Sequence, residues 1–594
     1  MGSTTAVQFE DMPLHWLFRP GRDTLHDVRL DYGWLIGFGL LLIATGIGLR
    51  DPWPADEPRF ALIVRDMVAT GEWLLPRVGG DVYADKPPLF FWLMGLSLLA
   101  TGSLRIAFLL PSLLAGIGCV LLIYDLGRRL WTRETGLAAG LALLLTIQFV
   151  WQARQAQIDA TLCFWCVLSL YGLLRHLLIG PAWRWYVVGW AAAGFGVITK
   201  GVGFLPLLLL IPFAVLRAGK WSPRAHGTSW LPWLLGPLAF IAAVGVWLVP
   251  MLLAAHADPM LAAYRDEILF HQTVGRYTDA WHHRKPVWYF AIEVIPALWM
   301  PLTLLLPWLT PQWRRAWREG DLRIALPLCW IVMVVVFFSL SSGKRGVYVL
   351  PAVPALALVC APYLIEMMQR RAIQFTAFVL SCTIAAVCLL GAVFLLMQPD
   401  QRAKVLADSD IDAFHPLLLM GLMTVLICII ARARRGFIAY AGVLTTILLV
   451  VSYWVNPVMN DARSGADFIS RVERTADPSL ELGFISFKEQ YLLNVHRAIV
   501  HFGHARWREA DQEAADAALW LSQSPRRQLV VSAYARNLCF TIAESVPLGE
   551  ANRIEWFIVR GAAHPDCVAR GTAVSMYHYS PPTVRRELLS AAND

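Results

Sequence analysis

Charged residues are scarce in this chain. They make up 16% of its 594 residues, whereas apolar residues make up 57%. Soluble globular proteins have about a quarter of their residues charged. The net charge is +8, but the basic residues lie in short clusters between apolar runs and form no single basic domain. The composition therefore excludes a typical soluble enzyme, gives no support to a nucleic-acid partner, and predicts an integral membrane protein.

A cleavable signal peptide and a cysteine framework are also missing from the sequence. The first 30 residues are polar, and Arg19, Arg22 and Arg29 precede the first apolar run. This pattern predicts a cytoplasmic N-terminus and not a secretory leader. Eight of the ten cysteines lie in apolar runs, where packing is their expected role. The other two, Cys539 and Cys567, could pair in an oxidising compartment.

Apolar runs of about 20 residues recur along the chain, and this length is typical of transmembrane helices. Many of the 26 tryptophans lie at the ends of these runs, as expected at a membrane interface. Fourteen candidate runs occur, at 33–49, 88–102, 104–126, 134–152, 158–180, 184–199, 201–217, 230–255, 287–309, 323–341, 347–368, 373–397, 413–431 and 436–458.

The positive-inside rule tests whether every run crosses the membrane. If all of them did, four basic clusters would lie outside. These clusters are Arg128-Arg129, Arg314-Arg315-Arg318, Arg370-Arg371 and Arg432-Arg434-Arg435. Making the shortest run, 88–102, an interfacial helix places all four in the cytoplasm. We therefore expect about 13 transmembrane helices, with the N-terminus inside and the C-terminus outside.

This topology divides the chain into two domains. Residues 1–458 form the transmembrane domain, whose long outer loops are 50–103, with interfacial helices, and 256–286. Residues 459–594 follow on the outer side. Strand-like runs at 482–487, 498–502, 528–532 and 555–559 alternate there with a helix-like stretch at 508–521, which predicts a small α/β domain.

Acidic residues gather on the predicted outer side, where spans end. Asp56-Glu57 follow the first span, and Asp159 lies at a later outer turn. Capping of a helix N-terminus explains either aspartate on its own. Ionisable residues at a membrane face nevertheless favour a functional role.

Two outer segments carry cations. Tyr83-Ala84-Asp85-Lys86-Pro87-Pro88 opens the interfacial helix, and a lysine beside free N–H groups at a helix N-terminus suits phosphate. Snorkelling to lipid headgroups is the alternative for Lys86. The segment 342–348 places Lys344, Arg345 and Tyr348 at an outer mouth, against the positive-inside pattern. An anionic ligand explains this placement. Lys200 lies at another outer turn, where a single lysine indicates no functional role.

The loop 256–286 contains several histidines and cations, among them His271 and Arg276. No pair has a strong metal-binding spacing such as HExxH. His271 and a carboxylate from another loop could bind one divalent ion, although a solvated histidine is the alternative. Cations and tyrosines fit a lipid phosphate, and carboxylates fit a sugar or an amine. An enzyme that moves a sugar from a lipid phosphate needs both.

Three of these segments also carry a family resemblance. The chain resembles the polyprenyl-phosphate-dependent glycosyltransferases of the membrane GT-C class, within the protein O-mannosyltransferase-like superfamily, and most of all the lipid A aminoarabinose transferases. The motifs are Asp56-Glu57, Tyr83-x-Asp85-Lys86-Pro87 and Lys344-Arg345-x-x-Tyr348-x-Leu350-Pro351. The resemblance covers the whole chain and implies an all-α polytopic membrane protein of GT-C type, with a small C-terminal α/β periplasmic domain.

The resemblance also implies an activity. The enzyme would transfer 4-amino-4-deoxy-L-arabinose from undecaprenyl phosphate to lipid A phosphates, at the periplasmic face of the bacterial inner membrane. Neutralising these phosphates weakens the attraction of cationic peptides such as polymyxin. Besides donor, acceptor and membrane lipids, no partner is implied, and we expect a monomer.

Residue roles follow from the same resemblance. Lys86, Arg276 and Tyr348 match the residues that hold the donor phosphate. Asp56 matches the acid required for catalysis. Tyr83 and Arg59 are further candidates for binding the donor phosphate, and Asp159 is a second acid in the cavity. Asp85 and His271 match a site for one divalent ion such as zinc. The family often has glutamate at position 85, and aspartate is shorter by one methylene.

Other functions stay open at this point. A sister transferase that moves mannose or another sugar to protein or glycan would carry similar motifs. A lipid-linked sugar transporter needs polar or broken helices at mid-membrane, but ionisable residues are scarce within the runs, with Glu293 as one exception. A receptor that binds its ligand through the tail is a third hypothesis, but the tail shows no recognisable motif that supports it.

Overall fold

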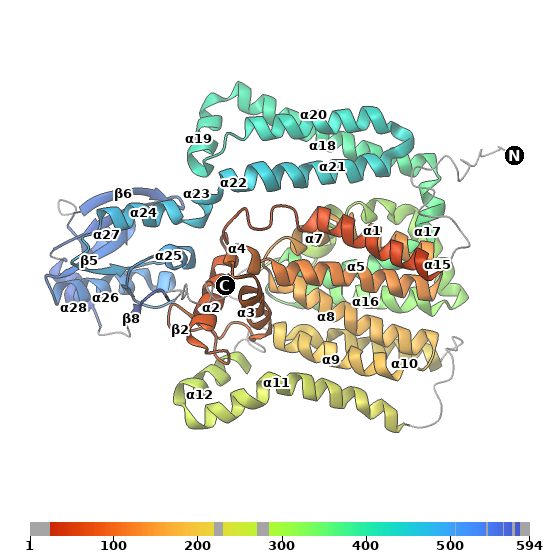
Figure 1. The fold of residues 1–594 in the computed structure, drawn as a ribbon, viewed down its shortest axis with the longest axis horizontal. Coiled ribbons are helices and arrows are strands. Elements are labelled where there is room, and N and C mark those ends of the chain that lie inside the picture. The colour runs from red at the N-terminus through yellow and green to blue at the C-terminus, as the bar shows by residue number, and fades with distance from the viewer. Residues whose placement is uncertain are drawn as a thin grey trace, which may run out of the picture.

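The computed structural model describes residues 24–218, 230–269, 284–504, 506–541, 545–561, 563–572 and 576–582. It is mostly helical. Helices running side by side form a bundle, a smaller part with a β-sheet lies at one end of it, and the short helices α2–α4 lie between the two (Figure 1).

The bundle follows the apolar runs of the sequence, because a backbone in lipid must satisfy its hydrogen bonds within its own helix. Within the described ranges, eight helical stretches are long and apolar enough to cross a membrane. They are α4–α5 (Leu104–Leu130), α8–η2 (Ile158–Ile179), η4–α11 (Leu231–Ala257), α16 (Leu322–Leu340), η8–α17 (Gly346–Met368), α18 (Arg371–Met397), α20 (Phe414–Ala431) and η9–α22 (Ala433–Val458).

Two further runs form bent pairs of helices. Helices α6 (Arg133–Leu144) and α7 (Ile147–Ala153) meet at 69°, and the stretches Phe290–Leu298 and Leu302–Glu319 meet at 102°. Counting each pair as one span gives up to 10 in the described part of the chain. The expected number of about 13 also requires α1 (Leu25–Ile43), α9 (Trp183–Lys200) and η3–α10 (Val202–Leu216) to cross, and it stays a prediction.

The run at 88–102 forms a short helix, α3 (Leu89–Thr101). Its 13 residues span about 20 Å, less than the roughly 30 Å of a hydrocarbon core. Gly102 ends the helix with φ 64°, a conformation that glycine adopts without strain. With α2 (Glu57–Thr70), α3 lies between the bundle and the tail (Figure 1). This length and position agree with an interfacial helix.

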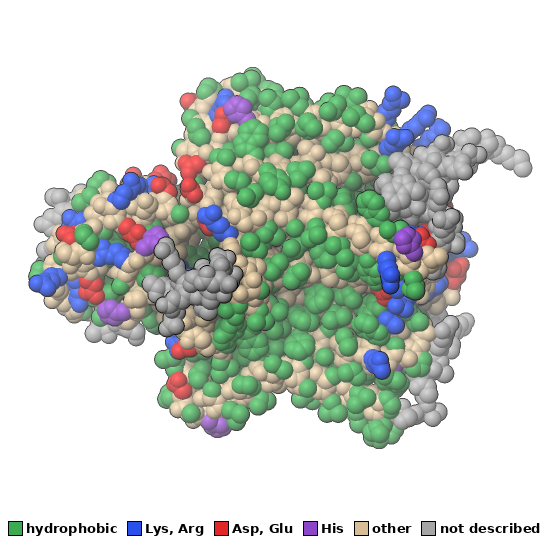
Figure 2. All heavy atoms as spheres, in the orientation of Figure 1, with side chains coloured by type: hydrophobic (Ala, Val, Ile, Leu, Met, Phe, Trp, Pro, Cys, Tyr) green, Lys and Arg blue, Asp and Glu red, His purple; other side chains and the backbone are tan. Residues whose placement is uncertain are grey.

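Charge separates the two ends of the bundle. Figure 2 shows an apolar middle, the tail at one end, and Lys and Arg gathered at the opposite end. Basic side chains also tie helices of the bundle together: Arg133 pairs with the buried Asp31 at 2.6 Å, and Arg323 donates to the Leu130 carbonyl at 3.1 Å. The end of the bundle opposite the tail is thus rich in basic residues.

The tail contains a six-stranded mixed sheet in the order β6-β7-β5-β3-β4-β8. Strands β3–β4 and β3–β5 are parallel, and the other pairs are antiparallel. The strands are β3 (Glu481–Phe484), β4 (Ile499–His501), β5 (Arg527–Ser532), β6 (Ser545–Ala551), β7 (Ile554–Val559) and β8 (Tyr577–Tyr579), and the main helices are α24 (Ala466–Thr475), α25 (Glu489–Asn494), α26 (Ala510–Ser522), α27 (Ala533–Cys539) and α28 (Pro565–Arg570). A disulfide joins Cys539 to Cys567, the pair that the sequence left open.

The tail and the first outer loop share one hydrophobic core. Phe60 and Ile63 of α2 and Phe90 and Phe91 of α3 belong to the same buried cluster as residues of the tail such as Tyr491. This shared core covers one face of α2 and fixes the loop against the tail. The loop is therefore an ordered layer between the bundle and the sheet.

Candidate active site

Asp56 and Glu57 begin α2 but have separate partners. Glu57 is buried and forms a double contact with Arg50, at 2.5 and 2.8 Å. It also accepts from the N–H groups of Trp53 and Ala156, each at 3.0 Å. Asp56 occupies the N-cap position without making the capping hydrogen bond, so the capping interpretation of this residue is wrong. Glu57 anchors the loop, which leaves Asp56 for another role.

Arg345 reaches Asp56 from a distant part of the chain. Its Nη2 lies 3.1 Å from Asp56 Oδ2. Burial lowers the pKa of Arg345, but the carboxylates of Asp56 and Asp159 and the phenol of Tyr348 act in the opposite direction and leave it raised. The guanidinium therefore stays charged and lies within electrostatic reach of both acids. One cation thus connects Asp56, Asp159 and Tyr348.

Lys200 completes the cluster, although the sequence suggested no role for it. Its Nζ lies 2.5 Å from Asp159 Oδ1 and 4.5 Å from the centroid of the Tyr348 ring. Lys200 ends α9, and Asp159 lies in the first turn of α8. Asp159 makes no capping hydrogen bond, since Gln157 holds the N-cap position. The structure thus corrects the capping interpretation of Asp159 and the absence of a role for Lys200, because the two residues form an ion pair.

The backbone beside Arg345 and Tyr348 is held by side chains of the bundle. Gln148 Nε2 donates to the Gly346 carbonyl at 2.7 Å, and Trp299 Nε1 donates to Gln148 Oε1 at 2.7 Å. Lys344 is buried and donates its ammonium hydrogens to the carbonyls of Lys285 and Ser341. The sequence placed Lys344 among the ligand-binding cations, but these contacts give it a structural role.

The first outer loop brings Arg59 and Tyr83 to the same region. Arg59 Nη1 lies 3.9 Å from Asp56 Oδ1, and its guanidinium carbon lies 6.0 Å from the centroid of the Tyr83 ring. Arg59 Nε donates to Glu489 of the tail at 2.6 Å. Tyr83 is buried, and this burial raises the pKa of its phenol. Arg59 thus connects the tail to the Asp56 cluster.

Asp85 and Lys86 lie in the turn that precedes α3, and both are partly buried. Their position next to Tyr83 places them on the same loop as Arg59. Arg276 and His271, the other expected ligands of phosphate and metal, lie outside the described residues. Within the described ranges, no group of three or more His, Cys, Asp or Glu residues is arranged to hold a metal ion.

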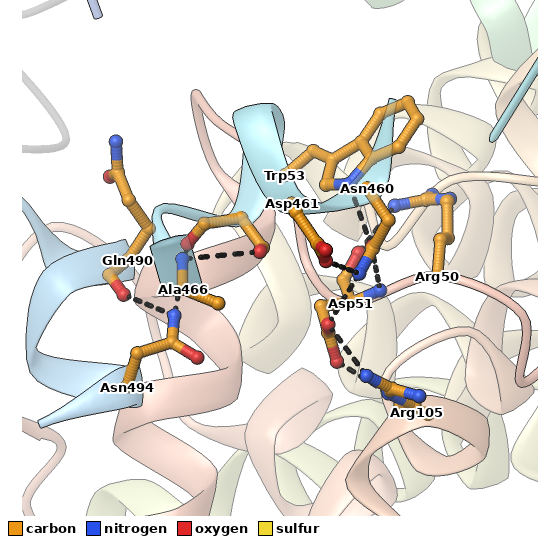
Figure 3. Close-up of polar contacts among 10 residues, drawn as sticks. Arg50, Asp51, Trp53, Arg105, Asn460, Asp461, Ala466, Gln490 and Asn494 are labelled. Atoms are coloured by element: carbon orange, nitrogen blue, oxygen red, sulfur yellow. Dashed lines mark hydrogen bonds and ion pairs between the residues drawn. The ribbon is translucent and has the colours of Figure 1, made fainter. Parts of the chain in front are cut away.

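The first outer loop is also tied to the short helix that follows the last apolar stretch. Figure 3 shows the Asn460 amide, at the start of α23 (Asn460–Ser464), facing Asp51. Asn460 Oδ1 accepts from the Asp51 N–H at 2.7 Å, and its Nδ2 donates to Asp51 Oδ2 at 2.8 Å. Arg105 pairs with the same carboxylate at 2.6 and 2.9 Å. These contacts hold the chain just before Asp56.

The cluster contains two carboxylates that are each paired with a cation, together with a tyrosine and Arg59. Such an array can bind an anionic group through its cations while its acids orient a polar partner. Clusters of interacting ionisable groups are frequent at functional sites. The arrangement therefore suits the transfer of a group between a phosphate and a second substrate.

Comparisons with known proteins agree on the class. A family model described as dolichyl-phosphate-mannose-protein mannosyltransferase matches residues 85–248. Curated proteins from Pseudomonas paraeruginosa and Pseudomonas aeruginosa, named undecaprenyl phosphate-alpha-4-amino-4-deoxy-L-arabinose arabinosyl transferase, are each 30% identical to the chain. The first match covers 65% of the chain and 69% of the relative, and the second covers 64% and 69%.

Solved structures share the fold. The crystal structure of ArnT from Cupriavidus metallidurans bound to undecaprenyl phosphate superposes with a TM-score of 0.69 at 20% sequence identity, and the match covers 89% of this chain and 97% of that one. The apo state of the same protein gives a TM-score of 0.68 at 19% identity, with 91% and 99% covered. The overall GT-C architecture is therefore established.

Proposed function

The chain belongs to the undecaprenyl phosphate-α-4-amino-4-deoxy-L-arabinose arabinosyl transferase family and is a membrane glycosyltransferase, and we propose that it transfers this aminoarabinose from undecaprenyl phosphate to phosphate groups of lipid A. The observation that carries the proposal is the cluster formed by Asp56–Arg345 and Asp159–Lys200 around Tyr348. It unites acids and cations on the side of the bundle that faces the tail.

The donor phosphate is held by cations and a phenol in this proposal. Lys86 and Tyr348 come from the described part of the chain, and Arg276 joins them from outside it. Arg59, with Tyr83 packed beside it, supplies a further guanidinium near Asp56. Guanidinium and ammonium groups form short, charge-assisted hydrogen bonds to phosphate oxygens, and these bonds strengthen as negative charge builds up on the leaving group.

The reaction is a substitution at the anomeric carbon of the sugar. A phosphate oxygen of lipid A forms a bond to that carbon, the bond between the carbon and the carrier phosphate oxygen breaks, and the electron pair leaves with undecaprenyl phosphate. A phosphate nucleophile is already largely ionised near neutral pH, since its second pKa is about 6. Asp56 therefore orients the acceptor or the sugar amine and need not remove a proton, and Asp159 is the second acid.

A divalent ion such as zinc is part of the proposal. The two residues that would hold it are Asp85 and His271, and an oxygen and a nitrogen donor suit zinc. When bound, the ion would neutralise negative charge on the leaving phosphate.

We also propose the location of the enzyme. It resides in the bacterial inner membrane as a multi-pass monomer, with the active site and the tail domain, 459–594, on the periplasmic side. The Lys and Arg residues gathered at the opposite end of the bundle support this orientation. Both substrates would then reach the site along the membrane surface, without leaving the lipid.

The test is the mass of lipid A from bacteria that lack the family enzyme, with and without this chain. Expression should add one or two aminoarabinose residues to lipid A and raise resistance to polymyxin. The matched control is Asp56→Asn at the same membrane abundance, which should leave lipid A unmodified. Unchanged lipid A together with mannosylated protein or glycan would favour a sister transferase, as would fit the mannosyltransferase family model.

A further inference from the structure

The tail contributes one ionised side chain to the candidate active site. Glu489 begins α25, and its Oε1 accepts from Arg59 Nε at 2.6 Å. Both side chains are largely shielded from water, with 13% of Glu489 and 23% of Arg59 exposed. The contact joins positions 430 residues apart. A shielded, short ion pair of this kind is much stronger than an exposed one.

Arg59 lies between two carboxylates at unequal distances. Its Nε is 2.6 Å from Glu489, whereas its Nη1 is 3.9 Å from Asp56. Electrostatic attraction falls with distance, and only the shorter contact is a hydrogen bond. Glu489 thus keeps the guanidinium out of direct contact with Asp56. Asp56 in turn keeps its contact with Arg345 at 3.1 Å.

Glu489 is itself fixed and charged. His504 Nε2 lies 2.9 Å from the same carboxylate oxygen, and the His504 N–H donates to Asp81 Oδ2 at 3.1 Å. Although burial acts to raise the pKa of Glu489, the hydrogen bond from His504 and the charge of Arg59 lower it to about 2. The carboxylate therefore remains ionised at any physiological pH.

Separate contacts hold this part of the tail on the first outer loop. His501 Nε2 lies 2.7 Å from the Gly79 carbonyl oxygen, and Tyr577 Oη donates to Asp81 Oδ1 at 2.9 Å. Arg65 donates to the Leu492 and Leu493 carbonyls, in the helix that Glu489 begins. Glu489 consequently has a fixed place relative to α2 and cannot follow Arg59 if the arginine moves.

We infer that Glu489 is a positioning residue for the transfer reaction, held over the membrane domain by the tail: it keeps Arg59 directed at the donor phosphate and away from Asp56. The inference rests on the proposed function of this site. Without the Glu489 charge, Arg59 would move toward Asp56 and compete with Arg345 for that carboxylate. Donor binding would then weaken, and Asp56 would be less available to orient the acceptor or the sugar amine.

The experiment uses the full-length enzyme in detergent or nanodiscs. Rates are measured with undecaprenyl phosphate-aminoarabinose and lipid A for wild type, Glu489→Gln, Glu489→Asp, Arg59→Gln and the double variant Glu489→Gln/Arg59→Gln. Binding of undecaprenyl phosphate alone is measured in parallel. Glu489→Gln should lower kcat/KM about tenfold, as for a lost charge-assisted hydrogen bond, and weaken undecaprenyl phosphate binding. Glu489→Asp should recover part of both.

Tyr579→Phe is the matched control. Tyr579 bonds to Arg65 and Asp66 at the same interface but does not touch Arg59. It should lower the melting temperature, as for a lost hydrogen bond at this interface, and leave kcat/KM within about twofold of wild type. The double variant should be no slower than Arg59→Gln alone, because Glu489 acts through Arg59.

Three results separate the possibilities. A Glu489→Gln enzyme with wild-type kcat/KM and wild-type undecaprenyl phosphate binding overturns the inference. The inference is also overturned if the loss of kcat/KM in the double variant equals the product of the losses in Glu489→Gln and Arg59→Gln. If wild type transfers no aminoarabinose while Glu489→Gln still weakens undecaprenyl phosphate binding, the proposed reaction fails and the positioning role of Glu489 stands.

Discussion

The carboxylates of Asp56 and Glu57 diverge, although the two residues are neighbours in the chain. Glu57 is buried against Arg50 and two backbone N–H groups, whereas Asp56 meets Arg345, 289 positions further along the chain. Glu57 therefore anchors the loop, and Asp56 is the candidate for the chemistry. Two isosteric substitutions separate these roles.

Asp56→Asn should abolish most of the transfer activity and leave the fold intact, because Asp56 makes no capping bond and its loss removes only two partly exposed ion pairs, with Arg345 and Arg59. Glu57→Gln should instead destabilise the protein by about 3 kcal/mol, since it leaves Arg50 as a buried charge without its partner. The measurements are the transfer rate and the melting temperature of each purified variant. Full activity in Asp56→Asn would exclude the proposed catalytic role.

Lys200 provides the second prediction. Lys200→Gln removes the charge that pairs with Asp159 and lies over Tyr348, so kcat/KM should fall at least about tenfold. Lys200→Arg keeps the charge and should retain more activity. Asp159→Asn combined with Lys200→Gln should lose less than the product of the single effects, because the pair acts as one unit. Independent effects would argue against a shared role.

Stability should depend on pH through Asp66. Burial next to the tail raises the pKa of this carboxyl to about 6 from the ordinary 3.8, against the opposing charge of Arg65. The folded state then binds more protons than the unfolded state between these values. The contribution of Asp66 to the free energy of unfolding should therefore decrease by up to about 3 kcal/mol as the pH rises from 4 to 6, and stay level above that.

Asp66→Asn should remove this slope, and thermal unfolding of both proteins across pH 4 to 8 measures it. Glu489 works in the opposite direction: its pKa of about 2 lies below the ordinary 4.5, so its contribution is lost as the pH falls below 4.5. His501 opposes Asp66 in this interval, because burial lowers the pKa of its imidazole to about 4 from the ordinary 6.5. The Asp66 effect is therefore read from the difference in unfolding free energy between wild type and Asp66→Asn, and a difference that does not change with pH would contradict the burial of Asp66.

The Cys539–Cys567 disulfide should stabilise the tail. It closes a segment with a sequence separation of 28, for which loop entropy gives about 3 to 4 kcal/mol. Reduction, or the Cys539→Ser/Cys567→Ser variant, should lower the unfolding temperature of the tail and impair folding in a reducing cytoplasm. Limited proteolysis followed by mass analysis of the tail checks this. Equal resistance with and without reductant would be the contrary result.

The helical bundle was readable from the sequence because lipid imposes a simple rule. Each apolar run folds into a helix, and the charge clusters predicted that α3 stays at the surface, in agreement with its 13 residues. The strands β3, β4, β5 and β7 overlap the strand-like runs near 482, 498, 528 and 555. Short-range patterns sufficed for these elements.

The site was only partly predictable, since its pairs join distant segments. Asp56, Asp159 and Tyr348 could be named from their motifs and resemblance, and the structure places them around Arg345. Lys200 carried no signal, because a single lysine at a turn is ordinary until its neighbours are known. Glu489 was missed for the same reason: nothing near position 489 indicates that Arg59 is its partner.

The shared core of the first outer loop and the tail also sets the order in which the protein is assembled. Phe60, Phe90 and Phe91 are synthesised early, but the tail residues of the same cluster, such as Tyr491, follow about 400 residues later. Until then the cluster is incomplete, and Arg59 lacks Glu489. With Arg59 in the proposed donor site, a nascent or truncated chain should have an incomplete site, and transfer activity should begin only after the tail has been synthesised.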